Sequence, residues 1–205
     1  MLTPETGGII FIHPQVSNLQ GILLPASLRP AEREAQMEED LIPVIRESIE
    51  LELNVSNLYA VFYNHFAEDE DFWWKLVLEE RKHAALLRSA EEYYRSIDRL
   101  PRGLIHHRLR ELKEANSRVL RLIDRYRDNP PGRAESFNIA HEIENRAGEL
   151  HFQEFMEKGA ESGIEEIFQR LNREDTHHSE RIRAYMDENG IPLLPAENIN
   201  ELFTE

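Results

Sequence analysis

Apolar residues recur at steps of three and four positions along most of this chain of 205 residues, which is the spacing of an amphipathic α-helix. One such stripe passes through Ile45, Ile49, Val55, Tyr59, Phe62 and Phe66. The pattern predicts five helices separated by turn-forming residues, and they span about residues 38–66, 71–97, 108–127, 134–158 and 164–186. No alternating pattern typical of β-strands competes with them, so the fold class is expected to be all-α.

The third predicted helix, at about 108–127, has the length of a connection that crosses a bundle. A helix of about 20 residues spans roughly 30 Å, which returns the chain along a bundle whose second and third core helices are parallel. We therefore expect a four-helix bundle of two antiparallel pairs over residues 38–188, with this helix as the crossover. Residues 1–37, which contain several prolines, are expected to form an extended N-terminal arm, and residues 189–205 a C-terminal tail.

The composition narrows the chemistry that is available to the chain. It has 24 Lys and Arg against 39 Asp and Glu, which gives a formal net charge of −15, and it has no Cys. Disulfides, thiolate metal sites and cysteine nucleophiles are therefore excluded, so a metal would be bound through nitrogen and oxygen ligands. The negative charge disfavours nucleic acids and anionic membranes as partners and favours cations.

No apolar run approaches the roughly 20 residues that a membrane-spanning helix requires, so no transmembrane segment is expected. The first Lys or Arg is Arg29, whereas a secretory signal places such residues ahead of an apolar run. The protein is therefore expected to be cytoplasmic.

The second and fifth predicted helices share a motif in which an acid is followed three residues later by histidine. Glu80 and His83 in the second helix align with Asp175 and His178 in the fifth at an offset of 95 residues. In both helices the motif lies within the apolar stripe, and residues three and four apart share one helical face. The four side chains are therefore expected to point into the core.

The first and fourth predicted helices each place one glutamate in the same kind of position. Glu52 interrupts an apolar stripe, and Glu144 aligns with it at an offset of 92 residues. Tyr59, seven positions after Glu52, is expected to pack in the core and to hydrogen-bond a nearby carboxylate. Its counterpart His151 could equally be an extra ligand, a hydrogen-bond donor to one, or a packing residue.

Four carboxylates and two imidazoles in one core require a compensating charge, because unpaired buried charges are strongly destabilising. No Lys or Arg occupies the stripes near these acids. Two divalent cations would balance the four carboxylates, and a mixture of imidazole and carboxylate favours iron or manganese over calcium or magnesium. The predicted metal ligands are Glu52, Glu80, His83, Glu144, Asp175 and His178.

This pattern resembles the ferritin-like di-iron carboxylate proteins and is closest in style to the rubrerythrin type. The resemblance covers roughly residues 38–188, and its motifs are Glu52 with Tyr59, Glu79-Glu80-x-x-His83, Ile143-Glu144 and Glu174-Asp175-x-x-His178. It implies a ferritin-like bundle with a crossover helix and two iron ions, with manganese as the alternative metal. It also implies oxidoreductase chemistry with O2 or peroxide, in a homo-oligomer that is at least a dimer.

Two features depart from the rubrerythrin pattern. Asp175 stands where Glu is usual, and Glu174 with His177 forms a competing pair one register away, although the apolar stripe favours Asp175 and His178. Rubrerythrins commonly carry a Cys-rich rubredoxin domain that passes electrons to the site, and this chain has no Cys. A peroxidase of this kind would need a separate electron-donor protein.

Two classes of function follow from these observations. The first is di-iron redox chemistry, as rubrerythrin-like peroxide reduction or Fe(II) oxidation, with iron storage and hydroxylation of an organic substrate as variants. The second is a non-enzymatic bundle that binds metal structurally or serves as a scaffold for partners. Redox turnover separates them, because a structural site need not react with O2.

Overall fold

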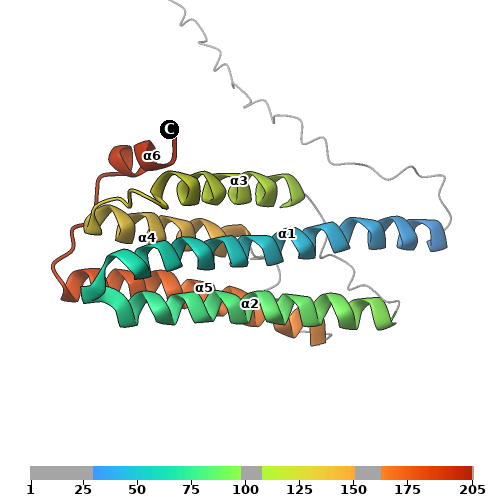
Figure 1. Cartoon of the computed structure of the whole chain (residues 1–205). Helices are drawn as coiled ribbons and strands as arrows, with labels where there is room; N and C mark the ends of the chain where they lie inside the picture. Colours follow the sequence, from blue (N-terminus) through green and yellow to red (C-terminus); the bar gives the residue numbers. More distant parts are fainter. Residues whose placement is uncertain (1–29, 98–107, 151–162, 205) are drawn as a thin grey trace, which may run out of the picture.

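Helices make up every regular element of the computed structural model, which describes residues 30–97, 108–150 and 163–204. The described part contains no strand, so the prediction of an all-α fold is confirmed. Its elements are α1 (Pro30–His65), η1 (Ala67–Asp69), α2 (Glu70–Ile97), α3 (Arg108–Tyr126), α4 (Arg133–Leu150), α5 (Gly163–Glu188) and α6 (Ala196–Thr204), as Figure 1 shows. Among these helices, none combines the length and the apolar character needed to span a membrane.

The long helices lie side by side (Figure 1). α1 packs against α2, α4 packs against α5, and α2 contacts α5, while α3 lies against α1 and α4. In Figure 1, α2 and α4 run in the same direction and α3 runs in the opposite one. α3 therefore lies antiparallel to the two helices that precede and follow it in the chain.

The apolar stripes face the interior, as their spacing predicts. Ile45, Tyr59 and Phe62 of α1 are completely buried. On α2, Trp73 has no exposed surface whereas the adjacent Trp74 is 42% exposed, because neighbouring residues of a helix point in different directions. Full burial of a large apolar side chain contributes about 1.5–3 kcal/mol, so these stripes supply the main driving force that places the polar residues between them.

α1 begins at Pro30, so the expectation of an extended arm is wrong for residues 30–37. Residues 1–29 lie outside the described part. Proline suits the first turn of a helix, because the N–H group that it lacks would have no partner there. Residues 31–37 are strong helix formers, namely Ala, Glu, Arg, Gln and Met, but they carry no apolar period that would reveal the helix.

The segment expected to be a C-terminal tail contains the helix α6, which packs against α4. Ile199 is buried, and Leu202 and Phe203 pack partly against the core. Asn138 of α4 holds the segment that leads to α6, because its Oδ1 accepts a 2.9 Å hydrogen bond from the backbone N–H of Leu194. The spacing of the three apolar residues already has the period of an amphipathic helix.

A buried ion pair joins the corner between α1 and α2 to α4 and α5. Arg133 donates from Nε and Nη2 to the two carboxylate oxygens of Asp69, at 2.8 and 2.7 Å. The hydroxyl of Tyr185 donates to Oδ1 of Asp69 at 2.9 Å. We call these three residues the Asp69 clamp, and they fix the end of the bundle at which α2 begins.

Candidate metal centre

The helices bring five of the predicted ligands together in the core. They are Glu52 of α1, Glu80 and His83 of α2, Glu144 of α4 and His178 of α5, and none is more than 4% exposed. Each interrupts an apolar stripe, so the burial of the stripe carries it inward. Acidic side chains are rarely buried unless they are paired, so this cluster must contain compensating charge.

Glu80 lies between the two imidazoles. Its Oε2 is 3.2 Å from Nδ1 of His83, and its Oε1 is 2.9 Å from Nδ1 of His178. A second carboxylate accompanies each histidine, since Oε2 of Glu52 lies 3.5 Å from Nδ1 of His83. Likewise, Oε2 of Glu144 lies 3.6 Å from Nδ1 of His178. The cluster thus consists of two similar half-sites, each a histidine with a glutamate, that share Glu80.

The imidazole rings of His83 and His178 are stacked, with centroids 5.1 Å apart and planes inclined by 12°. Together with Glu80, they offer three ligand atoms that all lie within 4.8 Å of one another. Nitrogen and oxygen ligands of an ion such as Zn²⁺ lie about 2.0–2.2 Å from it, so two ligands of one ion are at most about 4.4 Å apart. Small side-chain movements would therefore close this group around an ion.

The two adjacent histidines on α5 face different environments. His177 is exposed and His178 is buried, so His178 is the one that enters the cluster. The side chains of Glu174 and Asp175 lie outside the described residues, as does His151. Asp175 therefore stays a predicted ligand on the basis of the sequence repeat alone.

Tyr59 holds one oxygen of Glu144. Its hydroxyl donates to Oε1 of Glu144 at 2.5 Å, which agrees with the expectation that this buried phenol bonds a nearby carboxylate. Burial, followed by the charges of Glu144 and Glu80, raises the pKa of Tyr59 well above its usual value. The phenol therefore stays protonated as a donor, and the other oxygen of Glu144 is left to face His178.

Glu79 and Arg181 form an outer contact that sequence reasoning missed. The guanidinium of Arg181 pairs with the carboxylate of Glu79. Oε2 of Glu79 lies 3.4 Å from Nε2 of His178. A carboxylate at Nε2 favours a proton on that nitrogen, so once His178 loses one proton, its Nδ1 lone pair would be directed at the cluster. Glu79 precedes Glu80 directly, and Arg181 lies three positions after His178, but neither belongs to an apolar stripe.

The charges of the cluster keep both imidazoles protonated at neutral pH when no metal is bound. Burial lowers the pKa of His83, but the carboxylates of Glu52 and Glu80 outweigh it and raise the pKa to about 12. Burial likewise lowers the pKa of His178, and Glu144 and Glu80 raise it to about 10. Burial and the charge of Glu144 raise the pKa of Glu80 to about 7, against the opposing effect of the histidines.

The donor set suits a metal ion bound through nitrogen and oxygen. Oε1 of Glu80 and Nδ1 of His178 are buried, and neither makes a hydrogen bond to any residue that the structure describes. Their separation of 2.9 Å reflects attraction between charges without the alignment of a hydrogen bond. An ion between the ligand atoms would satisfy both lone pairs at once, and carboxylate with imidazole is a ligand mixture typical of iron, manganese and zinc.

Comparisons with known proteins leave the function to be argued from this site. No family model, no curated protein and no solved structure matches the chain.

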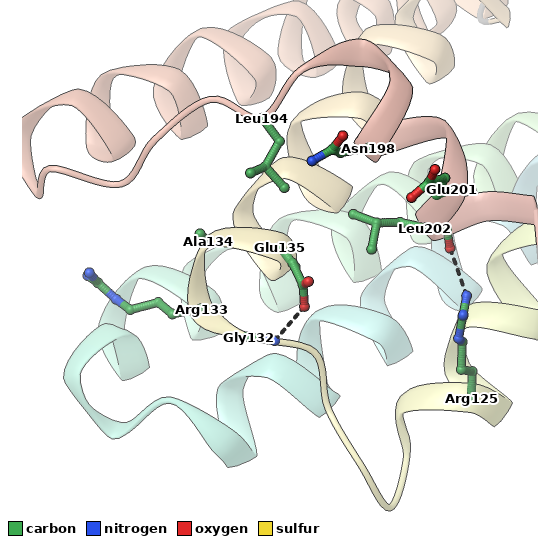
Figure 2. Close-up of a pocket in the computed structure, with 9 residues that line it drawn as sticks. All are labelled: Arg125, Gly132, Arg133, Ala134, Glu135, Leu194, Asn198, Glu201 and Leu202. Atoms are coloured by element: carbon green, nitrogen blue, oxygen red, sulfur yellow. Dashed lines mark hydrogen bonds between the residues drawn. The ribbon is translucent and has the colours of Figure 1, made fainter.

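A separate cavity of about 770 Å³ lies where the end of α3, the start of α4 and α6 meet (Figure 2). Two polar contacts at this cavity hold the chain together. In the first, the backbone N–H of Gly132 donates to Oε2 of Glu135 at 2.8 Å. Arg125 donates from Nη1 to the backbone oxygen of Leu202 at 3.1 Å and so ties α6 to α3. No residue of the buried Glu/His cluster lines this cavity, and we assign no ligand to it.

Proposed function

We propose that this chain is a ferritin-like di-iron protein of the rubrerythrin type, with α1, α2, α4 and α5 as the core helices and α3 as the crossover. The observation that supports this most strongly is the position of Glu80 between two buried imidazoles, each with a further glutamate beside it. A carboxylate shared by two half-sites suits a pair of metal ions, as in other helical bundles that bind two ions through Glu and His.

In the proposed site, two iron ions would be held by Glu80 together with the histidine and glutamate of each half-site. The sequence repeat makes Asp175 the counterpart of Glu80, so we expect Asp175 to supply a further carboxylate to the same site. With Glu52 and Glu144, the site then has four carboxylates, whose four negative charges equal the positive charge of two divalent ions. Metal would thus replace the protons that balance the cluster in its absence.

Bound iron would supply the electrons for reduction of O2 or peroxide, and manganese is the alternative metal. The residues of the chain hold and orient the ions. Tyr59 retains its proton and fixes the orientation of Glu144 through their hydrogen bond. The completely buried ring of Trp73 packs against the ring of Tyr59, with centroids 5.8 Å apart, and so supports the phenol that bonds Glu144. A separate electron donor completes the cycle, because the chain has no Cys for an iron–sulfur or rubredoxin-type centre.

A structural role is the second candidate, and the protonated histidines favour it. Three buried carboxylates with two imidazolium groups form an ionic core that needs no metal to approach neutrality. Such a bundle would be a scaffold, and its cluster would specify how the helices pair. It would bind metal weakly and show no redox turnover.

An anaerobic Fe(II) titration of the metal-stripped protein distinguishes the two candidates. We expect two Fe(II) per chain in the wild type, followed by oxidation with O2 or peroxide, recorded as near-ultraviolet absorption. Glu80→Gln removes the shared charge at nearly constant side-chain volume and should abolish binding of the two Fe(II) ions. Glu92→Gln, at an exposed position of the same helix, is the matched control and should bind as the wild type does.

Uptake of less than one Fe(II) per chain, or equal uptake by the wild type and Glu80→Gln, would reject the di-iron site. Binding of two ions without oxidation would favour the structural role. A faster reaction with peroxide than with O2 would favour the peroxidase over the ferroxidase.

A further inference from the structure

The middle of the outward face of α2, between residues 74 and 89, has a charge opposite to that of the chain as a whole. Its exposed positions between residues 74 and 89 carry four basic residues and no acidic one, although acids outnumber bases 39 to 24 in the whole sequence. We call this surface the α2 outer face, and it consists of Trp74, Lys75, Leu78, Arg81, Lys82, Ala85, Arg88 and Ser89.

Two large apolar side chains lie among these cations. Trp74 is 42% exposed and Leu78 is 48% exposed, and they are one helical turn apart. The ring of Trp74 packs against that of Tyr63 on α1, with centroids 5.2 Å apart, and this contact restricts the orientation of Trp74. A supported aromatic residue with an adjacent aliphatic one, surrounded by charges, is typical of the centre of a protein interface.

Three of the four basic side chains of this face are available to a partner. Lys75, Arg81 and Arg88 form no ion pair with a residue in the described ranges. Elsewhere an exposed arginine pairs with an acid of its own helix, as Arg110 does with Glu114 at 3.7 Å on α3. The α2 outer face therefore presents net positive charge, which attracts an acidic surface and steers its approach.

This face lies on the side of α2 opposite to the buried Glu/His cluster. Arg81 and Lys82 stand between Glu80 and His83 in the sequence, so the same helical turn carries cluster residues on its inner side and cations on its outer side. An α-helix with its side chains is about 10–12 Å across. A protein bound to the outer face would therefore lie about one helix diameter from the proposed iron site.

We propose that the α2 outer face docks an acidic one-electron carrier protein that reduces the iron site after each oxidation. This inference rests on the di-iron function proposed above. Two molecules of reduced carrier each lose one electron, and the two electrons convert two Fe(III) to two Fe(II). The carrier must be acidic because the face has only basic charges, and it must be a protein because Trp74 and Leu78 provide an apolar contact between them.

Charge reversal on two helices tests this docking site. The probe is flavodoxin, an acidic one-electron carrier, and the protein is the full chain. One double variant combines Lys75→Glu with Arg81→Glu on α2, and the matched control combines Lys113→Glu with Arg121→Glu at exposed positions of α3. Both change the net charge by the same amount. Calorimetry at low and moderate salt measures binding, and stopped-flow absorption measures electron transfer from reduced flavodoxin to the oxidised protein.

We expect binding at low salt to weaken about tenfold or more in the α2 variant, with a reduced salt dependence, and to change little in the α3 variant. The electron-transfer rate should fall in parallel while iron stoichiometry and melting temperature stay as in the wild type. Lys75→Gln with Arg81→Gln, which removes charge without reversing it, should show a smaller loss.

Equal losses in the two charge-reversal variants, or no loss in either, would overturn the proposed docking site. So would an α2 variant that binds flavodoxin normally but turns a dimer into a monomer in light scattering, because a second copy of this chain would then cover the face. Failure of the di-iron function would be seen separately as absent iron uptake, since the calorimetric measurement needs no iron.

Discussion

The Asp69 clamp and the buried Glu/His cluster both contain buried carboxylates, but the partners of these carboxylates differ. In the clamp, one carboxylate receives two hydrogen bonds from an arginine and one from a tyrosine. In the cluster, Glu80 faces two imidazoles that can lose their protons, and its Oε1 makes no hydrogen bond to a described residue. An arginine stays charged at every relevant pH, so the clamp is a closed structural contact. The cluster, in contrast, can exchange protons for metal ions.

The largest expected effect separates stability from metal binding. Asp69→Asn leaves the guanidinium of Arg133 without its charged partner, and breaking a buried pair costs about 3–5 kcal/mol. Because the side chain of Arg133 is 31% exposed, water compensates part of this loss, and we expect about 2–3 kcal/mol. Urea unfolding at pH 7 measures the loss, and the folded variant should keep its full metal stoichiometry.

Glu68→Gln is the control for this prediction. Glu68 is 63% exposed and its Oε1 lies 3.8 Å from Nε of the same arginine, so its removal should change the free energy of unfolding by less than about 0.5 kcal/mol. Equal losses from the two substitutions would show that the clamp is not a buried contact. Loss of metal uptake in folded Asp69→Asn would show that clamp and cluster are not independent.

The second prediction concerns the protons of the cluster. Metal must displace a proton from His178, whose pKa is raised to about 10, and from His83, whose pKa is raised to about 12. Metal affinity should therefore rise between pH 6 and 8, by up to about tenfold per pH unit for each proton released. Calorimetry with Mn²⁺ in buffers of different ionisation enthalpy counts the protons directly.

The same protons stabilise the metal-free bundle, and this contribution to stability falls as the pH rises, whereas metal affinity increases. Since both histidine pKa values are raised on folding, their contribution is fully present below the unfolded value of about 6.5. It is lost as the pH rises through the folded values.

Asp69→Asn, which changes the clamp and not the cluster, is the control for proton release. It should release as many protons on Mn²⁺ binding as the wild type does. An Mn²⁺ affinity that does not change with pH would contradict the assignment of protonated imidazoles.

The sequence predicts the inner part of this molecule better than its outer contacts. Glu52, Glu80 and His178 could be placed because each interrupts an apolar stripe, and burial of the stripe fixes the direction of its members. The first turns of α1 could not be found in this way, because residues 31–37 are good helix formers without an apolar period. The partner of Asp69 was equally hidden, since Arg133 is 64 positions away and lies at a helix start.

The apolar pattern of the sequence also does not reveal Arg181, because this residue lies outside every apolar stripe. Its substitution has the smallest effect that we expect. Its guanidinium holds Glu79, whose Oε2 faces Nε2 of His178, so it acts on the cluster only through another side chain. Loss of such an outer contact typically lowers metal affinity about 10–100-fold. Only one of the two half-sites has this contact in the described structure. We therefore expect Arg181→Gln to lower the affinity for one of the two ions by about tenfold.

Arg183→Gln is the matched control: Arg183 lies two positions away on α5, its side chain is 40% exposed, and it pairs with Asp187 of its own helix, so this variant should bind both ions normally. Titration with Mn²⁺ resolves the two affinities, and nitrogen NMR of the metal-free protein at high pH reports which nitrogen of His178 keeps its proton. A positioning role requires that Arg181→Gln shifts this proton away from Nε2, whereas a merely structural role would leave the tautomer unchanged. If the affinity for both ions falls equally, Arg181 supports the bundle as a whole. The contact of Glu79 with His178 would then not make the two half-sites differ in affinity.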